Sequence, residues 1–233
     1  MLVRLLLAIA VLLAVYESGA ETEELDLEYG EEINETCAGC HGEFGQGSIT
    51  GEYPRLAGLD AEYIAKQLSD FKLRKRINIP MIPFANDREL PGDEVRIIAA
   101  YLSQIQLPTR LEPVDEANFD ALERLHASKR VVNIKAYPGN IDLGRKVYED
   151  ECANCHARDG YGKKSKKAPM LAGQYSEYLL RQIQNFRKGE RMHDEEEDDR
   201  DLFIEISDEA MDGMLAYLAA LDDNQSQQTS DKR

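Results

Sequence analysis

Apolar side chains recur at helical spacing in several segments of this chain. Two segments, 61–73 and 176–186, each place aliphatic, aromatic and glutamine side chains on one helix face. These faces comprise Tyr63, Ile64, Gln67, Leu68 and Phe71, and Tyr178, Leu179, Gln182, Ile183 and Phe186. Further helices are predicted at 26–36, 93–104, 142–151 and 208–221. The pattern predicts an all-α fold.

The chain repeats itself along its length. A shift of 115 residues, the separation of Cys37 from Cys152, superimposes many positions of the first half on the second. The matched positions include Leu56-Ala57-Gly58 with Leu171-Ala172-Gly173, Tyr63 with Tyr178, Gln67 with Gln182, Phe71 with Phe186, and Arg76 with Arg191. A fixed period indicates copies of one structural unit. We therefore predict two small domains, at residues 21–107 and 139–223.

Residues 108–138 separate the two copies and are too many for a plain loop. Within them Phe119, Leu122 and Leu125 lie at helical spacing, which predicts a helix over 117–130. We expect this linker helix to pack across the two domains. After the last helix, residues 224–233 are expected to form a disordered tail.

All four cysteines belong to one motif that occurs twice, Cys37-Ala38-Gly39-Cys40-His41 and Cys152-Ala153-Asn154-Cys155-His156. Cys-x-x-Cys-His is the attachment site of c-type haem, in which both thiols become thioethers and the histidine is the proximal iron ligand. Two disulfides or a four-thiolate zinc site are the alternatives, but neither explains the histidine after both motifs. The motifs predict two covalently bound haem c groups.

The N-terminus predicts export. Arg4 supplies a positive charge, 5–15 is an apolar run too short to span a bilayer, and Ser18 and Ala20 are the small residues that a signal peptidase requires. We expect residues 1–20 to be a signal peptide that is cleaved after Ala20. No later segment is apolar enough to cross a membrane, so the mature protein is predicted to be soluble and periplasmic, where bacteria attach c-type haem.

The formal net charge of −16 limits the classes of partner. Such a surface disfavours nucleic acid and anionic lipid. It favours either the steering of basic protein partners or adaptation to high salt, and composition does not separate these two. Arg76 and Arg191 recur in register between the copies, so we expect them to neutralise haem propionates or to anchor a loop.

The layout resembles the dihaem class I c-type cytochromes of the cytochrome c-four type, to which the cytochrome subunit of flavocytochrome c sulfide dehydrogenase is related. The resemblance covers nearly all of the mature chain. Besides the haem motifs, it depends on Gly144 and Tyr148, on the Pro-x-Leu-Ala-Gly turn after each motif, and on the Tyr-Leu pair of each last helix. It implies two tandem class I cytochrome c domains, each wrapped around one haem, and a role in electron transfer.

In that family a methionine in the loop before the last helix is the sixth iron ligand. Met81, the only methionine of the first domain, fits this position, whereas the matching positions of the second domain, 195–199, are all acidic. Met192 and His193, just upstream, are equal candidates, and an iron without a sixth ligand is the third alternative. Less favoured methionines, which we expect to pack in a loop or the core, are Met170, Met211 and Met214.

The expected function is that of an electron carrier rather than an enzyme, because each haem accepts one electron and no side chain has to act as acid, base or nucleophile. One alternative is the electron-accepting dihaem subunit of a periplasmic oxidoreductase, for example one that oxidises sulfur compounds. Another is a haem enzyme or sensor with an open second iron. The expected partners are redox proteins, such as an oxidoreductase or a terminal oxidase.

Overall fold

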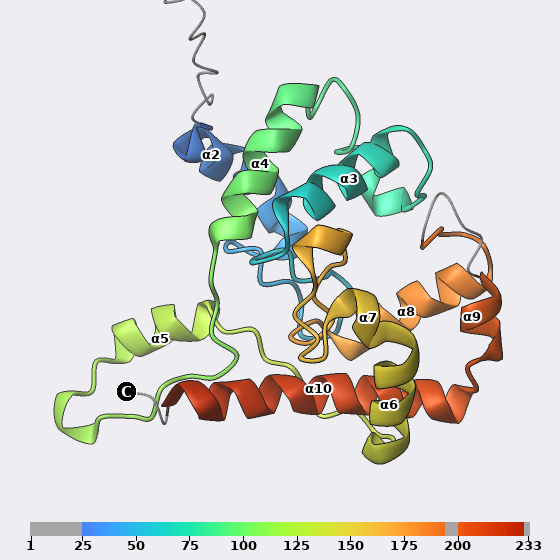
Figure 1. Ribbon diagram of the computed structural model, residues 1–233. Helices are drawn as coiled ribbons and strands as arrows, with labels where there is room; N and C mark the ends of the chain where they lie inside the picture. The colour runs from blue at the N-terminus through green and yellow to red at the C-terminus, as the bar shows by residue number, and fades with distance from the viewer. Residues whose placement is uncertain (1–24, 194–199, 231–233) are drawn as a thin grey trace, which may run out of the picture.

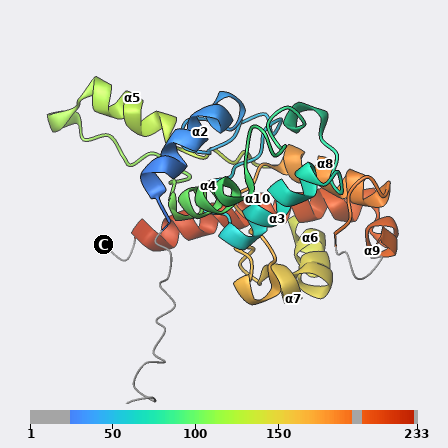
Figure 2. The same cartoon turned by 90° about the horizontal axis from the view of Figure 1, so that it is seen from above.

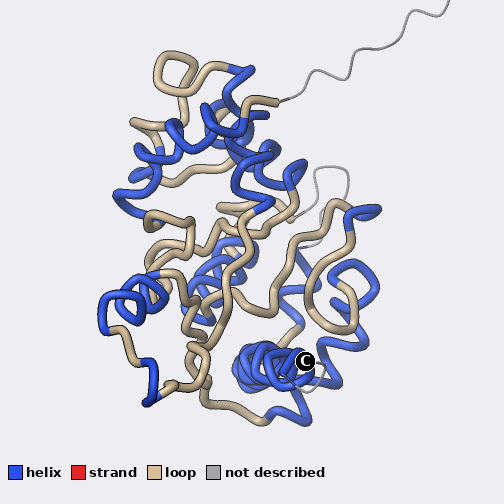
Figure 3. Tube along the Cα trace, turned by 90° about the vertical axis from the view of Figure 1, so that its left-hand side faces the viewer, coloured by secondary structure: helices blue, strands red, loops and turns tan. Residues whose placement is uncertain are grey.

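The structure is a computed structural model that describes residues 25–193 and 200–230 (Figure 1). Across these residues the chain forms helices joined by loops, with an isolated bridge between Lys163 and Ala168 and no β-strand (Figure 3). The all-α prediction is therefore confirmed. The predicted signal peptide, residues 1–20, and the acidic positions 195–199 lie outside the described residues.

The first half of the chain builds a small helical domain. Its elements are α2 (Leu27–His41), α3 (Ala61–Lys72), the 3₁₀ turn η1 (Ile79–Met81) and α4 (Gly92–Gln104). Asp60 starts α3 by accepting hydrogen bonds from the backbone N–H groups of Glu62 and Tyr63. Helix α2 crosses α4 closely, since a Cβ added at Gly30 would lie 2.6 Å from the Cβ of Tyr101.

The second half builds a domain of the same plan. Its elements are α6 (Ile141–Val147), the π-helical turn η3 (Tyr148–Cys152), α7 (Ala153–His156), the 3₁₀ turn η4 (Lys164–Lys166), α8 (Ser176–Arg187), α9 (Arg200–Glu205) and α10 (Asp208–Ser230). Short α6 lies against long α10 (Figure 1). Buried side chains from α8, α9 and α10 form the core together with Tyr148, which has no exposed surface.

Two predictions differ from the structure, one about the C-terminal tail and one about the linker. Helix α10 continues to Ser230, through residues 224–230 that the sequence predicted as a disordered tail. The stretch contains no glycine or proline to end the helix. The linker helix α5 (Ala121–Lys129), preceded by the 3₁₀ turn η2 (Glu116–Asn118), projects from the body of the molecule (Figure 2).

The linker contacts both domains through a residue other than those predicted. Helix α5 has no buried residue, and its apolar residues are exposed, so it does not pack across the domains. Val132, beyond the helix, is instead fully buried in a cluster with Ala57 and Leu107 of the first domain and Tyr175 of the second. An apolar residue beyond the helix, rather than the helix itself, therefore makes the buried contact with both domains.

Backbone and side-chain hydrogen bonds also join the two domains. The buried side chain of Gln174 accepts from the backbone N–H of Arg55 (3.0 Å) and donates to its carbonyl oxygen (2.9 Å). The hydroxyl of Tyr175 donates to the carbonyl oxygen of Gln46 (2.8 Å). Buried polar groups that are fully paired favour one relative orientation of the domains. No helix in the described ranges is both long and apolar enough to cross a membrane.

Candidate haem sites

The two motif histidines occupy equivalent positions at the ends of α2 and α7. His41 and His156 are each 7% exposed. The Nδ1 atom of His41 lies 3.0 Å from the carbonyl oxygen of Pro54, and that of His156 lies 2.8 Å from the carbonyl oxygen of Pro169. A carbonyl oxygen only accepts, so Nδ1 carries the proton in both rings. The Nε2 lone pair is therefore the one available to a metal ion.

Burial keeps both imidazoles neutral, which is the form that binds iron. It lowers the pKa of His41, against the opposing effect of the hydrogen bond to Pro54. It lowers the pKa of His156 to about 4, again opposed by the hydrogen bond to Pro169 and assisted by the nearby His193. The second histidine is thus strongly biased toward the metal-binding form.

The four cysteines are unpaired, as haem attachment requires. None forms a disulfide, and Cys37 and Cys152 have thiols whose pKa is raised by burial, that of Cys152 to about 12. Among the described side chains no group of three or more histidine, cysteine, aspartate or glutamate residues could hold a metal ion. The unpaired cysteines and the neighbouring histidine of each motif fit one haem c in each domain.

Each motif is followed by a residue with a left-handed backbone. This is Gly42 (φ 81°) in the first domain but Ala157 (φ 65°) in the second, where a side chain makes that conformation unfavourable. The buried hydroxyl of Tyr148 donates to the carbonyl oxygen of Ala157 (2.6 Å) and so holds the strained residue. In the first domain the amide of Asn34 donates to the carbonyl oxygen of Glu43 (2.8 Å). The turn that positions each motif histidine is thus supported from the helix before it.

Of the predicted sixth-ligand candidates, the structure brings His193 to a motif histidine. The ring centroids of His156 and His193 are 6.0 Å apart. Met192 beside it is 58% exposed, and Met81 is half-buried in η1, where its carbonyl oxygen accepts from the N–H of Ala85 (2.8 Å). The less favoured methionines are buried in the cores: Met170, Met211 and Met214.

Six side chains that match in the repeat form a reciprocal network between the domains, which we name the interdomain arginine network. Arg76 donates to Gln67 of its own domain (2.7 Å) and to Tyr178 (3.0 Å) and Gln182 (2.9 Å) of the other. Arg191 does the converse, donating to Gln182 (2.8 Å), Tyr63 (3.0 Å) and Gln67 (3.0 Å). The repeat places these residues in register, but the sequence does not indicate that they meet.

This network concentrates positive charge at the domain boundary. Neither Arg76 nor Arg191 forms an ion pair with a carboxylate of the described chain. Burial by itself raises the pKa of Tyr178. The charges of Arg76 and Arg191 outweigh this effect and lower the pKa below its usual value. Buried charges are stable only when they are hydrogen-bonded or paired, and here tyrosine and glutamine oxygens accept from both guanidinium groups.

Comparisons with known proteins match this geometry. The profile of the family described as cytochrome c matches residues 27–106 and again residues 141–222. This chain belongs to the cytochrome c family. Two class I domains in one chain make it a dihaem cytochrome with two covalently bound haem c groups, and its activity is electron transfer.

This cytochrome has relatives in sequence and in fold. The chain is 33% identical over 183 residues, 78% of its length and 77% of the other, to a thiosulfate dehydrogenase electron acceptor of Stutzerimonas stutzeri (strain A1501). It is 32% identical over 190 residues, 81% of its length and 88% of the other, to cytochrome c4 of Thiocapsa roseopersicina. The crystal structure of reduced cytochrome c4 from Pseudomonas stutzeri shares the fold with a TM-score of 0.64 and 22% identity, over 84% of this chain and 98% of that one.

Proposed function

We propose that this cytochrome is exported to the periplasm and accepts electrons there from a dehydrogenase that oxidises a reduced sulfur compound, with thiosulfate as the first candidate. The interdomain arginine network supports electron transfer between the two haems, because it joins the two haem domains through equivalent residues. An electron that enters through one domain can then leave through the other. The similarity to a thiosulfate dehydrogenase electron acceptor supports the choice of donor.

The haem-binding residues follow from the motif and the local geometry. Cys37 and Cys40 form the thioethers of the first haem, with His41 as proximal ligand, and the second motif does the same with His156. Met81 is the sixth ligand of the first iron, as its place before the last helix of the domain suggests. A thioether sulfur favours the ferrous state and raises the reduction potential. The bound haem supplies the one-electron chemistry, and the protein supplies ligands, burial and orientation.

The interdomain arginine network has a second role in this proposal. We assign the positive charges of Arg76 and Arg191 to the haem propionates, because the described chain offers them no carboxylate partner. Charge-assisted hydrogen bonds of this kind are stronger than neutral ones. They would hold both haems against the same boundary between the domains and so shorten the path between them.

The test is reduction of the oxidised holoprotein by the thiosulfate dehydrogenase of the organism that encodes this chain. With thiosulfate present, we expect both haems to be reduced, as seen in the visible absorption bands, and the rate to depend on ionic strength since the surface is acidic. Enzyme without thiosulfate and thiosulfate without enzyme are the controls. If the dehydrogenase leaves the cytochrome oxidised while a terminal oxidase reoxidises chemically reduced cytochrome, the donor proposed here is wrong.

A further inference from the structure

Another imidazole, that of His193, lies close to the second proximal histidine. The ring centroids of His156 and His193 lie 6.0 Å apart, and the ring planes are tilted by 39°. Two imidazoles bound to opposite sides of one metal ion hold their centroids about 6 Å apart, because each metal–nitrogen bond is about 2 Å long. The separation of the two rings therefore suits one iron between them.

Two phenylalanines hold the His193 ring in this place. Its centroid lies 5.3 Å from that of Phe186, on α8, and 5.3 Å from that of Phe203, on α9, in edge-to-face contacts at 86° and 73°. The two phenyl rings stack on each other, with centroids 4.9 Å apart. Edge-to-face and stacked arrangements are the favoured geometries of aromatic pairs. The imidazole is thus positioned by side chains from two helices.

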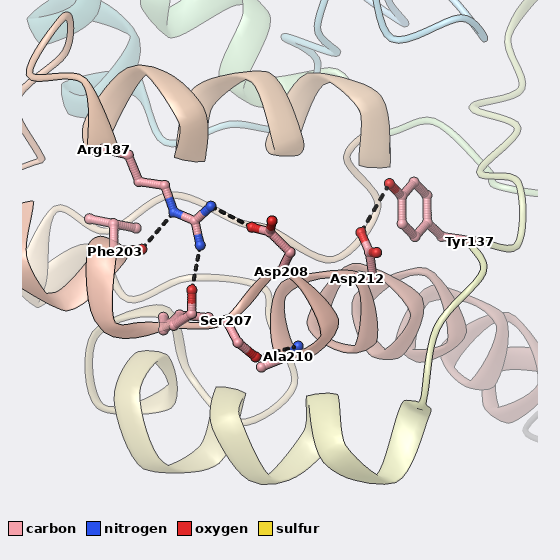
Figure 4. A network of polar contacts seen from close by, with 8 residues as sticks. Tyr137, Arg187, Phe203, Ser207, Asp208, Ala210 and Asp212 are labelled. Carbon is pink, nitrogen blue, oxygen red and sulfur yellow. Dashed lines mark hydrogen bonds and ion pairs between the residues drawn. The ribbon is translucent and has the colours of Figure 1, made fainter.

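One of these phenylalanines belongs to a segment that Arg187 anchors (Figure 4). The guanidinium of Arg187 donates to the carbonyl oxygen of Phe203 (2.7 Å), to that of Ile206, and to the carboxylate of Asp208 (2.8 Å). These bonds tie the end of α9 and the start of α10 to the end of α8. The ring of Phe203 is therefore set by α8 as well as by its own helix.

The methionines of the second domain have other surroundings. Met211 and Met214 are 1% and 4% exposed in the core, where the sulfur of Met214 lies 3.8 Å from that of Cys152. Met192 is 58% exposed. Of the two candidates that the sequence leaves open, it is His193 whose ring meets that of His156.

We propose that His193 is the sixth ligand of the second haem iron, so that this chain carries one haem with a histidine and a methionine and one with two histidines. Histidine favours the ferric state relative to methionine, so the second haem has the lower potential. This inference rests on the proposed function and gives the electron transfer a direction. Electrons enter at the second domain and pass to the first. The dehydrogenase then docks on the second domain.

The experiment is spectroscopic and needs no redox partner. The near-infrared magnetic circular dichroism of the ferric full-length holoprotein separates iron bound by methionine from iron bound by two histidines. We expect methionine ligation for half of the haem in the native protein, and a twofold gain of that signal in His193→Met. Met192→Leu, the matched control one residue away, should leave the spectrum unchanged. Haem content, at two per chain, verifies that each variant has folded and matured.

A third variant separates ligation from folding. His193→Ala should convert half of the haem to the high-spin ferric form, and added imidazole should restore the low-spin form. Methionine ligation at both haems, a high-spin second haem in the native protein, or loss of a ligand in Met192→Leu would each overturn the assignment. Because these spectra are recorded without a dehydrogenase, they can support His193 even where thiosulfate dehydrogenase fails as the donor, and the reverse also holds.

Discussion

The replacement Gly144→Ala tests how tightly the second domain is closed around its haem motif. Gly144 lies on α6 where that helix crosses α10, and an added Cβ would lie 1.9 Å from the carbonyl oxygen of Gly213 and 2.4 Å from the backbone nitrogen of Met214. Cβ atoms in proteins do not approach other atoms closer than 3.0 Å. The obstacle is backbone, which cannot rotate away, so the two helices have to separate by roughly 1 Å.

The expected cost exceeds the intrinsic preference for alanine. Alanine is favoured over glycine in a helix by about 1 kcal/mol. Overpacking a core costs about 1–3 kcal/mol, and we expect the upper end here because no side-chain rotamer can relieve the contact. The net loss is about 2 kcal/mol. For a domain of this size, each kcal/mol shifts Tm by about 4–8 °C, so we expect Tm to fall by roughly 10 °C.

The assay is differential scanning calorimetry of the ferric holoprotein. Gly92→Ala is the matched control, because this glycine has no positive φ and a Cβ added there meets no atom within 4 Å. The control should keep the native Tm or raise it slightly. A Tm for Gly144→Ala equal to or above the native value would show that α6 and α10 can separate freely, and the reasoning from their contact would be wrong.

Three further predictions concern the haems, the domain boundary and the linker. Replacing Cys152 and Cys155 together by serine should leave one covalent haem per chain, measured by the pyridine haemochrome assay. Arg76→Met removes three hydrogen bonds across and within the domains and should lower the free energy of unfolding by about 2 kcal/mol in urea titrations. The backbone N–H groups of Glu123 and Leu122 donate to the carboxylate of Asp120 and lower its pKa. This cap therefore stabilises α5 above the usual pKa of the carboxyl group, and the stabilisation is lost as the pH falls through the lowered pKa. Carbon-13 NMR of the carboxyl group can follow this titration.

For each of these predictions, a specific result would contradict the reasoning. Two haems retained after both cysteines are replaced would mean that the second motif is not an attachment site. Arg88, whose guanidinium is exposed, provides the control for the network, and equal losses for Arg76→Met and Arg88→Met would remove the interdomain argument. A titration midpoint for Asp120 at or above the value of a free aspartate would show that the cap does not form in solution.

Most of the fold could be predicted because its evidence is local. The helices predicted from 61, 93, 176 and 208 begin at Ala61, Gly92, Ser176 and Asp208 in the structure. Helical periodicity and Asp caps act within a few residues, so one sequence suffices to recognise them. The linker was harder, because Phe119, Leu122 and Leu125 show helical spacing while remaining exposed. Spacing indicates a helix face but not what covers it.

The sequence by itself determined the cofactor, its stoichiometry and the two-domain plan. A haem motif places two thiols and an imidazole within one turn or so of chain, and a repeat in register needs no knowledge of contacts. Only the tertiary structure decided that Arg76 and Arg191 exchange partners across the domains, and that His193 rather than Met192 meets His156. The physical reason is that these contacts join segments far apart in the chain. Their geometry depends on how α8, α9 and the neighbouring domain pack, which no local pattern specifies.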